Sequence, residues 1–325
     1  MAVVGIIANP SAGKDIRRLV AHGRVVSNQE KSNILRRVFA GVASTDTKKI
    51  LIMPDHSGLS ISAAADVSKK LEVEYLDMRV ADSQESSTLA AQKMYQEKVD
   101  CIVTLGGDGT NRVVAKGCKN IPLVPISTGT NNVFPAPTEG TLAGIVAGRI
   151  ADKTLSIKES CNQSKKIDIF CNDEFIDDAL VDVAISKEMF VGARAVWDIN
   201  TLHSIILTRA EPVSIGLSSI GSRIENINID DPFGLYIILD KNIKRSKKYI
   251  KAPIAPGTIP KIKIVDYKKI TTKDKIFIET YPGTIALDGE REIELLPDNN
   301  YYAILNLDGP WVASIPRSMK VLSNI

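Results

Sequence analysis

The chain has 325 residues, 44% of them apolar and 24% charged, which is typical of globular proteins that bury a core. Lys and Arg number 41 and Asp and Glu number 38, so the net charge of +3 does not favour a nucleic-acid partner. No apolar run approaches the roughly 18 residues of a spanning helix, and the four cysteines lack C-x-x-C spacing. The first residues read as a strand and not as a signal peptide, so we expect a cytoplasmic protein with no membrane partner.

Strand and helix patterns alternate over the first 150 residues. Apolar runs predict strands at 2–8, 49–53, 73–78, 101–105 and 123–126. Helical spacing predicts a helix that begins at a capping box over 27–30 and continues to 42, and further helices at 60–71, 88–98, 112–118 and 138–150. This alternation indicates βαβ units, and therefore a parallel sheet in the first domain.

The pattern changes after about residue 150. Short apolar segments predict strands at 167–171, 179–186, 213–217, 235–239, 262–265, 275–279, 284–287 and 301–307. One helix is predicted within 190–208, and Gly, Pro, Asn and Asp separate the strands. Residues 151–304 are therefore expected to form an all-β, sandwich-like second domain.

A glycine-rich turn follows the fourth predicted strand. The sequence CIVTLGGDGTN over 101–111 ends an apolar strand with Gly106, Gly107 and Gly109, and a helical pattern follows. Glycines allow a ligand to approach the backbone and permit positive φ, and the start of a helix offers free N–H groups to a phosphate. Open α/β sheets bind ligands at the carboxyl ends of their strands, so the turn is a predicted phosphate site.

Asp108 lies within this turn. A carboxylate beside a polyphosphate is repelled unless it has a role, such as accepting a proton from an attacking hydroxyl or binding phosphate-associated Mg²⁺. A simple Asx turn is the structural alternative. Two familiar motifs are excluded, because Ala8 and Asp15 break a Walker A pattern and Arg112 occupies the third glycine position of G-x-G-x-x-G.

Two more polar loops follow strands at the same predicted sheet edge. They are NPSAGK over 9–14 and STGTNN over 127–132. Their hydroxyl and amide groups suit hydrogen bonds with phosphate or ribose, although each loop alone is typical of an ordinary turn. Three such loops after parallel strands favour one shared ligand site.

These motifs resemble the ATP-NAD kinase superfamily, which is related to the diacylglycerol and sphingosine kinases, and within it the acetoin-catabolism X-type proteins. GGDGT over 106–110 and NPSAG over 9–13 carry the resemblance. Weaker matches follow in order: ALVDVAI over 179–185, PVSIGLSSIG over 212–221, PIAPG over 253–257 and LDGE over 287–290. The resemblance covers nearly the whole chain.

The resemblance implies transfer of the γ-phosphoryl group of ATP, with Mg²⁺, to a hydroxyl group. Asp108 would be the proton acceptor or charge organiser, and Mg²⁺ would accompany ATP without a dedicated protein ligand. The nucleotide- and phosphate-binding residues would be Asn9, Ser11, Gly106, Gly107, Gly109, Thr110, Asn111, Thr128, Gly129, Thr130 and Asn131. Asp182, Ser214 and Asp288 would lie on the acceptor side. The family also implies that residues 305–325 return to the first domain and that the protein forms a homo-oligomer.

The acceptor side departs from the NAD-kinase pattern. Val181 and Asp182 stand where NAD kinases carry Asn-Glu, and Ile215 and Leu217 replace expected hydroxyl residues. The acceptor, NAD or another small molecule, therefore stays open, and NAD or NADP could also be a bound ligand. A non-catalytic nucleotide-binding regulator and a lipid or small-alcohol kinase are the alternatives.

Overall fold

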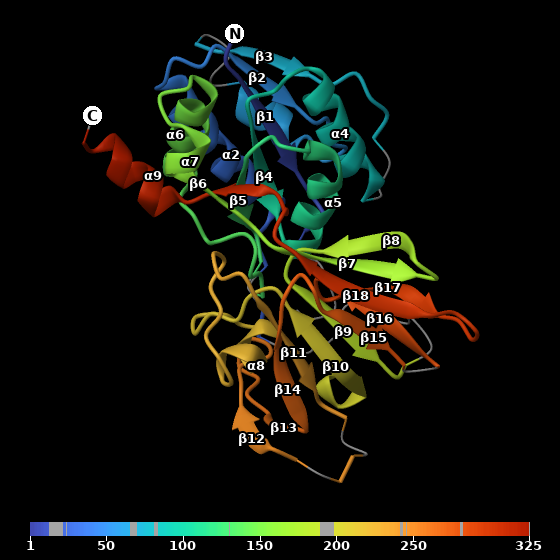
Figure 1. Ribbon diagram of the computed structural model, residues 1–325. Helices are drawn as coiled ribbons and strands as arrows, with labels where there is room; N and C mark the ends of the chain where they lie inside the picture. The colour runs from blue at the N-terminus through green and yellow to red at the C-terminus, as the bar shows by residue number, and fades with distance from the viewer. Residues whose placement is uncertain are drawn as a thin grey trace.

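The computed structural model describes residues 1–12, 22–23, 25–65, 70–80, 84–129, 131–188, 198–240, 243–244, 246–279 and 282–324. Figure 1 shows an α/β unit built on the N-terminal half, above a second unit made of strands. The predicted fold class is confirmed, with a parallel sheet flanked by helices followed by a domain of antiparallel strands.

A seven-stranded sheet forms the centre of the first unit, in the order β3-β2-β1-β4-β5-β19-β6. Its strands are β1 (Val3–Ala8), β2 (Lys49–Ile52), β3 (Glu72–Tyr75), β4 (Cys101–Gly106), β5 (Leu123–Ser127), β6 (Cys161–Gln163) and β19 (Trp311–Ala313). All neighbours pair in parallel except β19 and β6. The strand order reverses direction between β1 and β4, which makes the carboxyl ends of these strands the switch point where such sheets bind ligands.

Helices cover both faces of this sheet (Figure 1). One face carries α2 (Asn28–Ala43), α3 (Leu59–Ala64), α6 (Gly140–Ala151), α7 (Ile157–Ser160) and α9 (Ile315–Leu322), and the other carries α4 (Glu85–Gln96) and α5 (Asp108–Cys118). Successive strand residues point to opposite faces, so Ile6 packs in one core and Ile7 in the other. This two-sided burial explains the continuous apolar strands of the sequence.

Glycines bring α2 and α6 into close contact. A Cβ atom on Gly144 would lie 2.1 Å from the carbonyl oxygen of Val38, and one on Gly41 would lie 2.3 Å from that of Thr141. Larger side chains would force the two helices apart. Ser27 caps the start of α2 by accepting the N–H of Glu30 at 3.2 Å, as the sequence predicts.

Two antiparallel sheets pack face to face in the second unit. The six-stranded sheet contains β14 (Asp266–Ile270), β11 (Gly234–Ile238), β10 (Leu202–Leu207), β9 (Asp182–Ser186), β16 (Gly283–Leu287) and β17 (Glu290–Leu295). The four-stranded sheet contains β15 (Lys275–Ile278), β18 (Tyr301–Asn306), β7 (Lys166–Cys171) and β8 (Glu174–Ala179). Aliphatic side chains from both sheets share one core. The hairpin of β12 (Lys248–Lys251) and β13 (Lys261–Ile264) and the short helix α8 (Ser218–Ser222) cover the opposite face of the six-stranded sheet.

Two predicted elements are wrong. Residues Val213 to Leu217 form no strand but a turn leading into α8, with Val213 91% exposed and Gly216 at φ +84°. The helix predicted within 190–208 is replaced by a 3-10 turn (Ile199–Thr201) and strand β10, while residues 190–197 lie outside the described part of the chain. Both segments are apolar, and their exposure and pairing depend on tertiary contacts that a local pattern does not contain.

The chain crosses between the two units more than once. Strand β6 pairs in the first sheet although it lies beyond the boundary expected at residue 150, and β19 and α9 return to that unit after β18. In the described ranges, no helix is both long and apolar enough to cross a membrane.

Candidate functional site

The three predicted loops meet at the switch point of the parallel sheet. Asn9 follows β1 and Thr110 follows β4. The side-chain amide of Asn9 donates a hydrogen bond to Oγ1 of Thr110 at 3.1 Å. The backbone N–H of Thr128, after β5, donates to the carbonyl of Gly106 at 3.2 Å. Ser11 is exposed beside them, with its N–H bonded to Oδ1 of Asn9 at 2.8 Å. The predicted residue Thr130 lies outside the described residues.

A buried lysine holds the first loop from below. Lys31 on α2 has no exposed surface, and its ammonium donates to the carbonyls of Asn9, Pro10 and Ala12 at 3.3, 2.7 and 2.9 Å. These bonds hold the loop carbonyls toward α2. The ammonium of Lys31 also adds a buried positive charge on the inner side of a loop that is predicted to bind phosphate.

The glycine-rich turn owes its composition to close contacts. None of Gly106, Gly107 and Gly109 has a positive φ, contrary to one reason for expecting glycine there. A Cβ on Gly106 would instead lie 2.6 Å from Cβ of Thr110, and a Cβ on Gly107 would lie 2.9 Å from the amide of Asn132. Helix α5 begins at Asp108, so the positive end of its dipole and its first N–H groups lie at this turn.

Asn111 holds the turn together from inside. It is fully buried, accepts the hydroxyl of Thr104 at 2.6 Å and donates to the carbonyl of Gly107 at 2.9 Å. The structure therefore places this predicted phosphate ligand behind the loop, where it orders the turn and does not face a ligand.

The carboxylate of Asp108 is fixed by the two residues that directly follow the third loop. Its Oδ1 accepts the N–H groups of Val133 at 3.0 Å and Phe134 at 2.8 Å, and Oδ2 is 3.1 Å from the same Val133 N–H. Asp108 is 9% exposed and lines a cavity. The carboxylate is thus immobilised at the helix start while it still faces open space.

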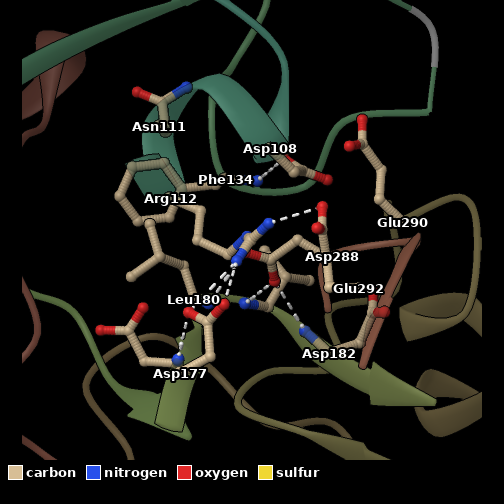
Figure 2. A network of polar contacts seen from close by, with 12 residues as sticks. Asp108, Asn111, Arg112, Phe134, Asp177, Leu180, Asp182, Asp288, Glu290 and Glu292 are labelled. Atoms are coloured by element: carbon tan, nitrogen blue, oxygen red, sulfur yellow. Dashed lines mark hydrogen bonds and ion pairs between the residues drawn. The ribbon is translucent and has the colours of Figure 1, made fainter. Parts of the chain in front are cut away.

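Arg112, one turn further along α5, connects the two units through a buried ion network (Figure 2). Its guanidinium is 1% exposed and donates to Asp177 of β8 at 3.2 Å and to Glu292 of β17 at 3.0 Å. Its Nε lies 4.0 Å from Asp288, in the turn between β16 and β17. Burial alone would lower the pKa of Arg112, but the facing carboxylates Asp288, Asp177 and Glu292 raise it.

The carboxylate of Asp288 holds the backbone of residues 180–182 in place. Its carboxylate accepts the N–H groups of Leu180 at 3.0 Å, Val181 at 2.7 Å and Asp182 at 3.2 Å. Burial raises the pKa of Asp288 to about 6, with Asp108 contributing in the same direction and Arg112 opposing it. Asp288 and Gly289 have φ values of +50° and +79°, as the two central residues of a tight type I′ hairpin turn between β16 and β17 require.

The cavity lies between the units and has a volume of about 280 Å³. Its polar lining residues are Asp108, Asp182, Asp198, Asp288, Asn131, Asn200 and Thr258, and of these the side chain of Asp288 has no exposed surface. Its apolar lining includes Val133, Ile199, Ile215, Leu217, Ile254, Ala255 and Pro260. Of the predicted acceptor-side residues, Asp182 and Asp288 are among the lining residues. Ser214 is not among them, although the next three residues, Ile215 to Leu217, are.

Several site residues were not predicted. Asp198 and Asn200 line the cavity from the 3-10 turn, and Arg209 lies over the ring of Phe134 at 5.3 Å from its centroid. Burial lowers the pKa of Arg209. Glu290 lies against Gly109 and accepts the side-chain amide of Gln84 at 2.8 Å. Isolated polar residues in loops give no local signal, because only the fold brings them to the site.

Dedicated metal coordination is not evident. Within the part of the chain that the structure describes, no three His, Cys, Asp or Glu side chains are grouped so as to hold a metal ion. The predicted absence of a protein-borne metal site therefore stays a prediction, and a metal ion bound to ligand phosphates remains compatible with the loops described above.

Comparison with known proteins agrees with this architecture. Residues 4–153 match the ATP-NAD kinase N-terminal domain, and residues 165–308 match the acetoin catabolism protein X C-terminal domain. Acetoin catabolism protein X of Cupriavidus necator is 35% identical over 315 residues, which cover 94% of this chain and 88% of that protein.

The chain belongs to the acetoin catabolism protein X family. The resemblance drawn from the GGDGT turn and the later motifs is thereby confirmed. Among solved structures, UDP-GlcNAc 2-epimerase from Neisseria meningitidis is similar at a TM-score of 0.27 and 14% identity, over 48% of this chain and 44% of that one. This likeness is too low to inform either fold or function.

Proposed function

We propose that this protein is an ATP-dependent phosphotransferase that acts on a hydroxyl group of a small molecule. The observation that carries the proposal is the position of Asp108, which lies at the start of α5, between the three polar loops and the cavity. A phosphate tail at the loops and an alcohol in the cavity would meet at this carboxylate. The match to the ATP-NAD kinase N-terminal domain supports the same reading.

The loops would hold ATP by neutral hydrogen bonds and by the helix dipole. The N–H groups of the turn over 106–110, the hydroxyl groups of Ser11 and Thr110, and the amide of Asn131 suit phosphate oxygens. Lys31 adds a positive charge beneath the first loop. Mg²⁺ on the phosphates would supply neutralisation of the charge that develops during transfer.

Transfer requires a proton acceptor, and Asp108 is placed to be one. The acceptor oxygen forms a bond to the γ-phosphorus, and the bond from that phosphorus to the β–γ bridging oxygen breaks, leaving its electron pair on ADP. The hydroxyl proton passes to the carboxylate of Asp108. The N–H groups of Val133 and Phe134 fix this carboxylate, so its orientation does not depend on the ligand.

The acceptor is proposed to be a small hydroxyl compound. The name of the Cupriavidus necator relative connects that protein with acetoin, a hydroxy ketone, and the cavity of about 280 Å³ suits a molecule of modest size. NAD stays one arm of the test, because the N-terminal family match includes NAD-phosphorylating enzymes by name.

The test is transfer of label from γ-labelled ATP with Mg²⁺ to a panel of alcohols that includes NAD and acetoin. We expect transfer to at least one acceptor, and a loss of at least about a hundredfold in the Asp108→Asn variant with ATP affinity changed much less. Asp308→Asn is the matched control, since its side chain is 72% exposed. Transfer that persists in Asp108→Asn would overturn the assigned role.

One observation favours a second candidate, a nucleotide-binding regulator without transfer. Both oxygens of Asp108 already lie within hydrogen-bond distance of backbone N–H groups, as in an aspartate that serves only to hold two loops together. ATP that binds tightly and is never turned over with any acceptor supports this candidate. In that case Asp108→Asn lowers stability and ATP affinity together.

A further inference from the structure

We propose that the molecule bound in the cavity carries no negative charge, and that the acidic lining selects it. The inference rests on the proposed function only in treating this molecule as the phosphoryl acceptor. It assigns a chemical class, namely neutral or cationic compounds with hydroxyl groups and an apolar side. Phosphorylated or carboxylated alcohols are excluded from the cavity.

The lining is one-sided in charge. Asp108 of α5, Asp182 of β9 and Asp198 at the start of the 3-10 turn supply three carboxylates. Asp288 of the β16–β17 turn also belongs to the lining residues, but its carboxylate is fully buried behind the cavity wall. Asp108, Asp182 and Asp288 lie within one view of the site in Figure 2, on elements from both units. No Lys, Arg or His stands among the lining residues in the described ranges.

The nearby cations are engaged elsewhere. Arg112 donates hydrogen bonds from its two terminal nitrogens to Asp177 and Glu292, outside the cavity lining, and its Nε lies 4.0 Å from the buried carboxylate of Asp288. Arg209 packs on the ring of Phe134, and neither arginine is part of the lining. Both temper the field of the carboxylates, but neither offers its charge to a ligand in the cavity.

An added negative charge would therefore be strongly disfavoured. At about 6 Å and an effective dielectric constant of about 20, one carboxylate weakens binding of another unit negative charge about a hundredfold. Three carboxylates of the lining act together here, and the buried carboxylate of Asp288 behind them adds to the same field. The anionic part of ATP is therefore expected at the loops, where the helix start offers N–H groups and the charge of buried Lys31 lies behind the first loop.

The remaining lining indicates what the cavity accepts. Carboxylate oxygens accept hydrogen bonds, and Oδ1 of Asn131 is buried with no hydrogen-bond partner among the described residues. A hydroxyl or ammonium group would donate to Oδ1 of Asn131, and carboxylates accept such donors as well. The apolar lining faces the same space through residues such as Ile215, Leu217 and Ile254, so one side of the molecule is expected to be apolar.

Matched pairs of compounds test the inference by binding, without any need for turnover. Calorimetry would compare glycerol with glycerol 3-phosphate, adenosine with AMP, ribose with ribose 5-phosphate, and serinol with glycerate, with a non-hydrolysable ATP analogue present to fill the loops. We expect at least one neutral or cationic member to bind at least tenfold more tightly than its anionic partner. Equal or tighter binding of the anionic members, or no binding by any uncharged or cationic member, would overturn the inference.

A variant identifies the source of the selection. Asp182→Asn keeps the shape of the side chain and removes one charge, so the ratio between neutral and anionic affinities should fall by about tenfold to a hundredfold. Asp308→Asn, outside the lining, should leave that ratio unchanged. An unchanged ratio in Asp182→Asn would contradict the inference. The two proposals fail on different results, because this test measures binding. Charge selection without phosphoryl transfer would contradict only the proposed function. Phosphoryl transfer to an anionic alcohol would contradict only the charge selection.

Discussion

Replacing Arg112 with methionine would test the ion network that joins the two units. The side chain is 1% exposed, and its loss leaves Asp177, Glu292 and Asp288 without their shared cation. Breaking a buried pair in this way costs about 3–5 kcal/mol. Asp177 keeps Lys116 at 2.6 Å, and Asp177 and Glu292 are 18% and 20% exposed, so water and Lys116 absorb part of the loss. We therefore expect Arg112→Met to lower the free energy of unfolding by about 3 kcal/mol, the lower end of this range.

The dependence on pH distinguishes this network from ordinary packing. The folded-state pKa of Asp288 is about 6, above its ordinary 3.8, so its contribution favours the folded state below about pH 4 and is lost as the pH rises through 6. Arg112 lowers the pKa of Asp288, so in Arg112→Met this pKa is higher and the folded state loses more stability as the pH rises. The destabilisation of Arg112→Met should thus be about 1 kcal/mol smaller at pH 5 than at pH 7.5.

Urea unfolding at the two pH values measures this effect. Arg37→Met is the matched control, because Arg37 also contacts two carboxylates, Glu30 at 2.9 Å and Glu139 at 3.2 Å, but is 43% exposed. It should cost no more than about 1 kcal/mol at either pH. A cost for Arg112→Met equal to that of the control, or one that does not change with pH, would contradict the role assigned to the Arg112 network.

Three further predictions concern the loops, the helices and the thiols. Lys31→Met should weaken ATP binding about tenfold, because three loop carbonyls lose their hydrogen-bond donor. Lys48 is exposed, so Lys48→Met should leave ATP affinity unchanged. Calorimetry measures both affinities, and equal effects would contradict the role of Lys31. Gly144→Ala should lower the free energy of unfolding by about 2 kcal/mol, because its Cβ would meet the carbonyl of Val38, and a neutral effect in urea would count against the α2–α6 contact. Burial raises the pKa of Cys118 to about 12 and also raises that of Cys101, so at pH 8 a disulfide reagent should modify half-buried Cys171 in the native protein and the other three thiols only after unfolding. Rapid reaction of a second thiol would contradict the burial.

Much of the fold could be predicted because local patterns determine it. Strands buried on both faces give continuous apolar runs, and the helices between them carry capping and periodic signals, as at Ser27. The glycine turn could be located for the same reason, since close contacts with Thr110 and Asn132 tolerate no side chain. The prediction that the loops after β1 and β4 belong to one site rested on parallel topology, and the Asn9–Thr110 bond agrees with it.

The other half of the site could not be predicted from local pattern. Asp198 and Asn200 reach the cavity from a segment predicted to be helical, and Ile215 and Leu217 reach it from a predicted strand that is a turn. Arg112 gives a helical signal, but its partners lie 65 and 180 residues away in sequence. Asn111 lies in the glycine-rich motif, yet its side chain turns inward to Thr104. Such roles depend on long-range contacts.

A crystal structure with a non-hydrolysable ATP analogue and Mg²⁺ would test the central claim most directly. We expect the phosphates at the loops over 9–12, 106–110 and 128–131, with the terminal phosphate beside Asp108 and the cavity open behind it. Phosphates bound inside the cavity, or anywhere away from the start of α5, would contradict it.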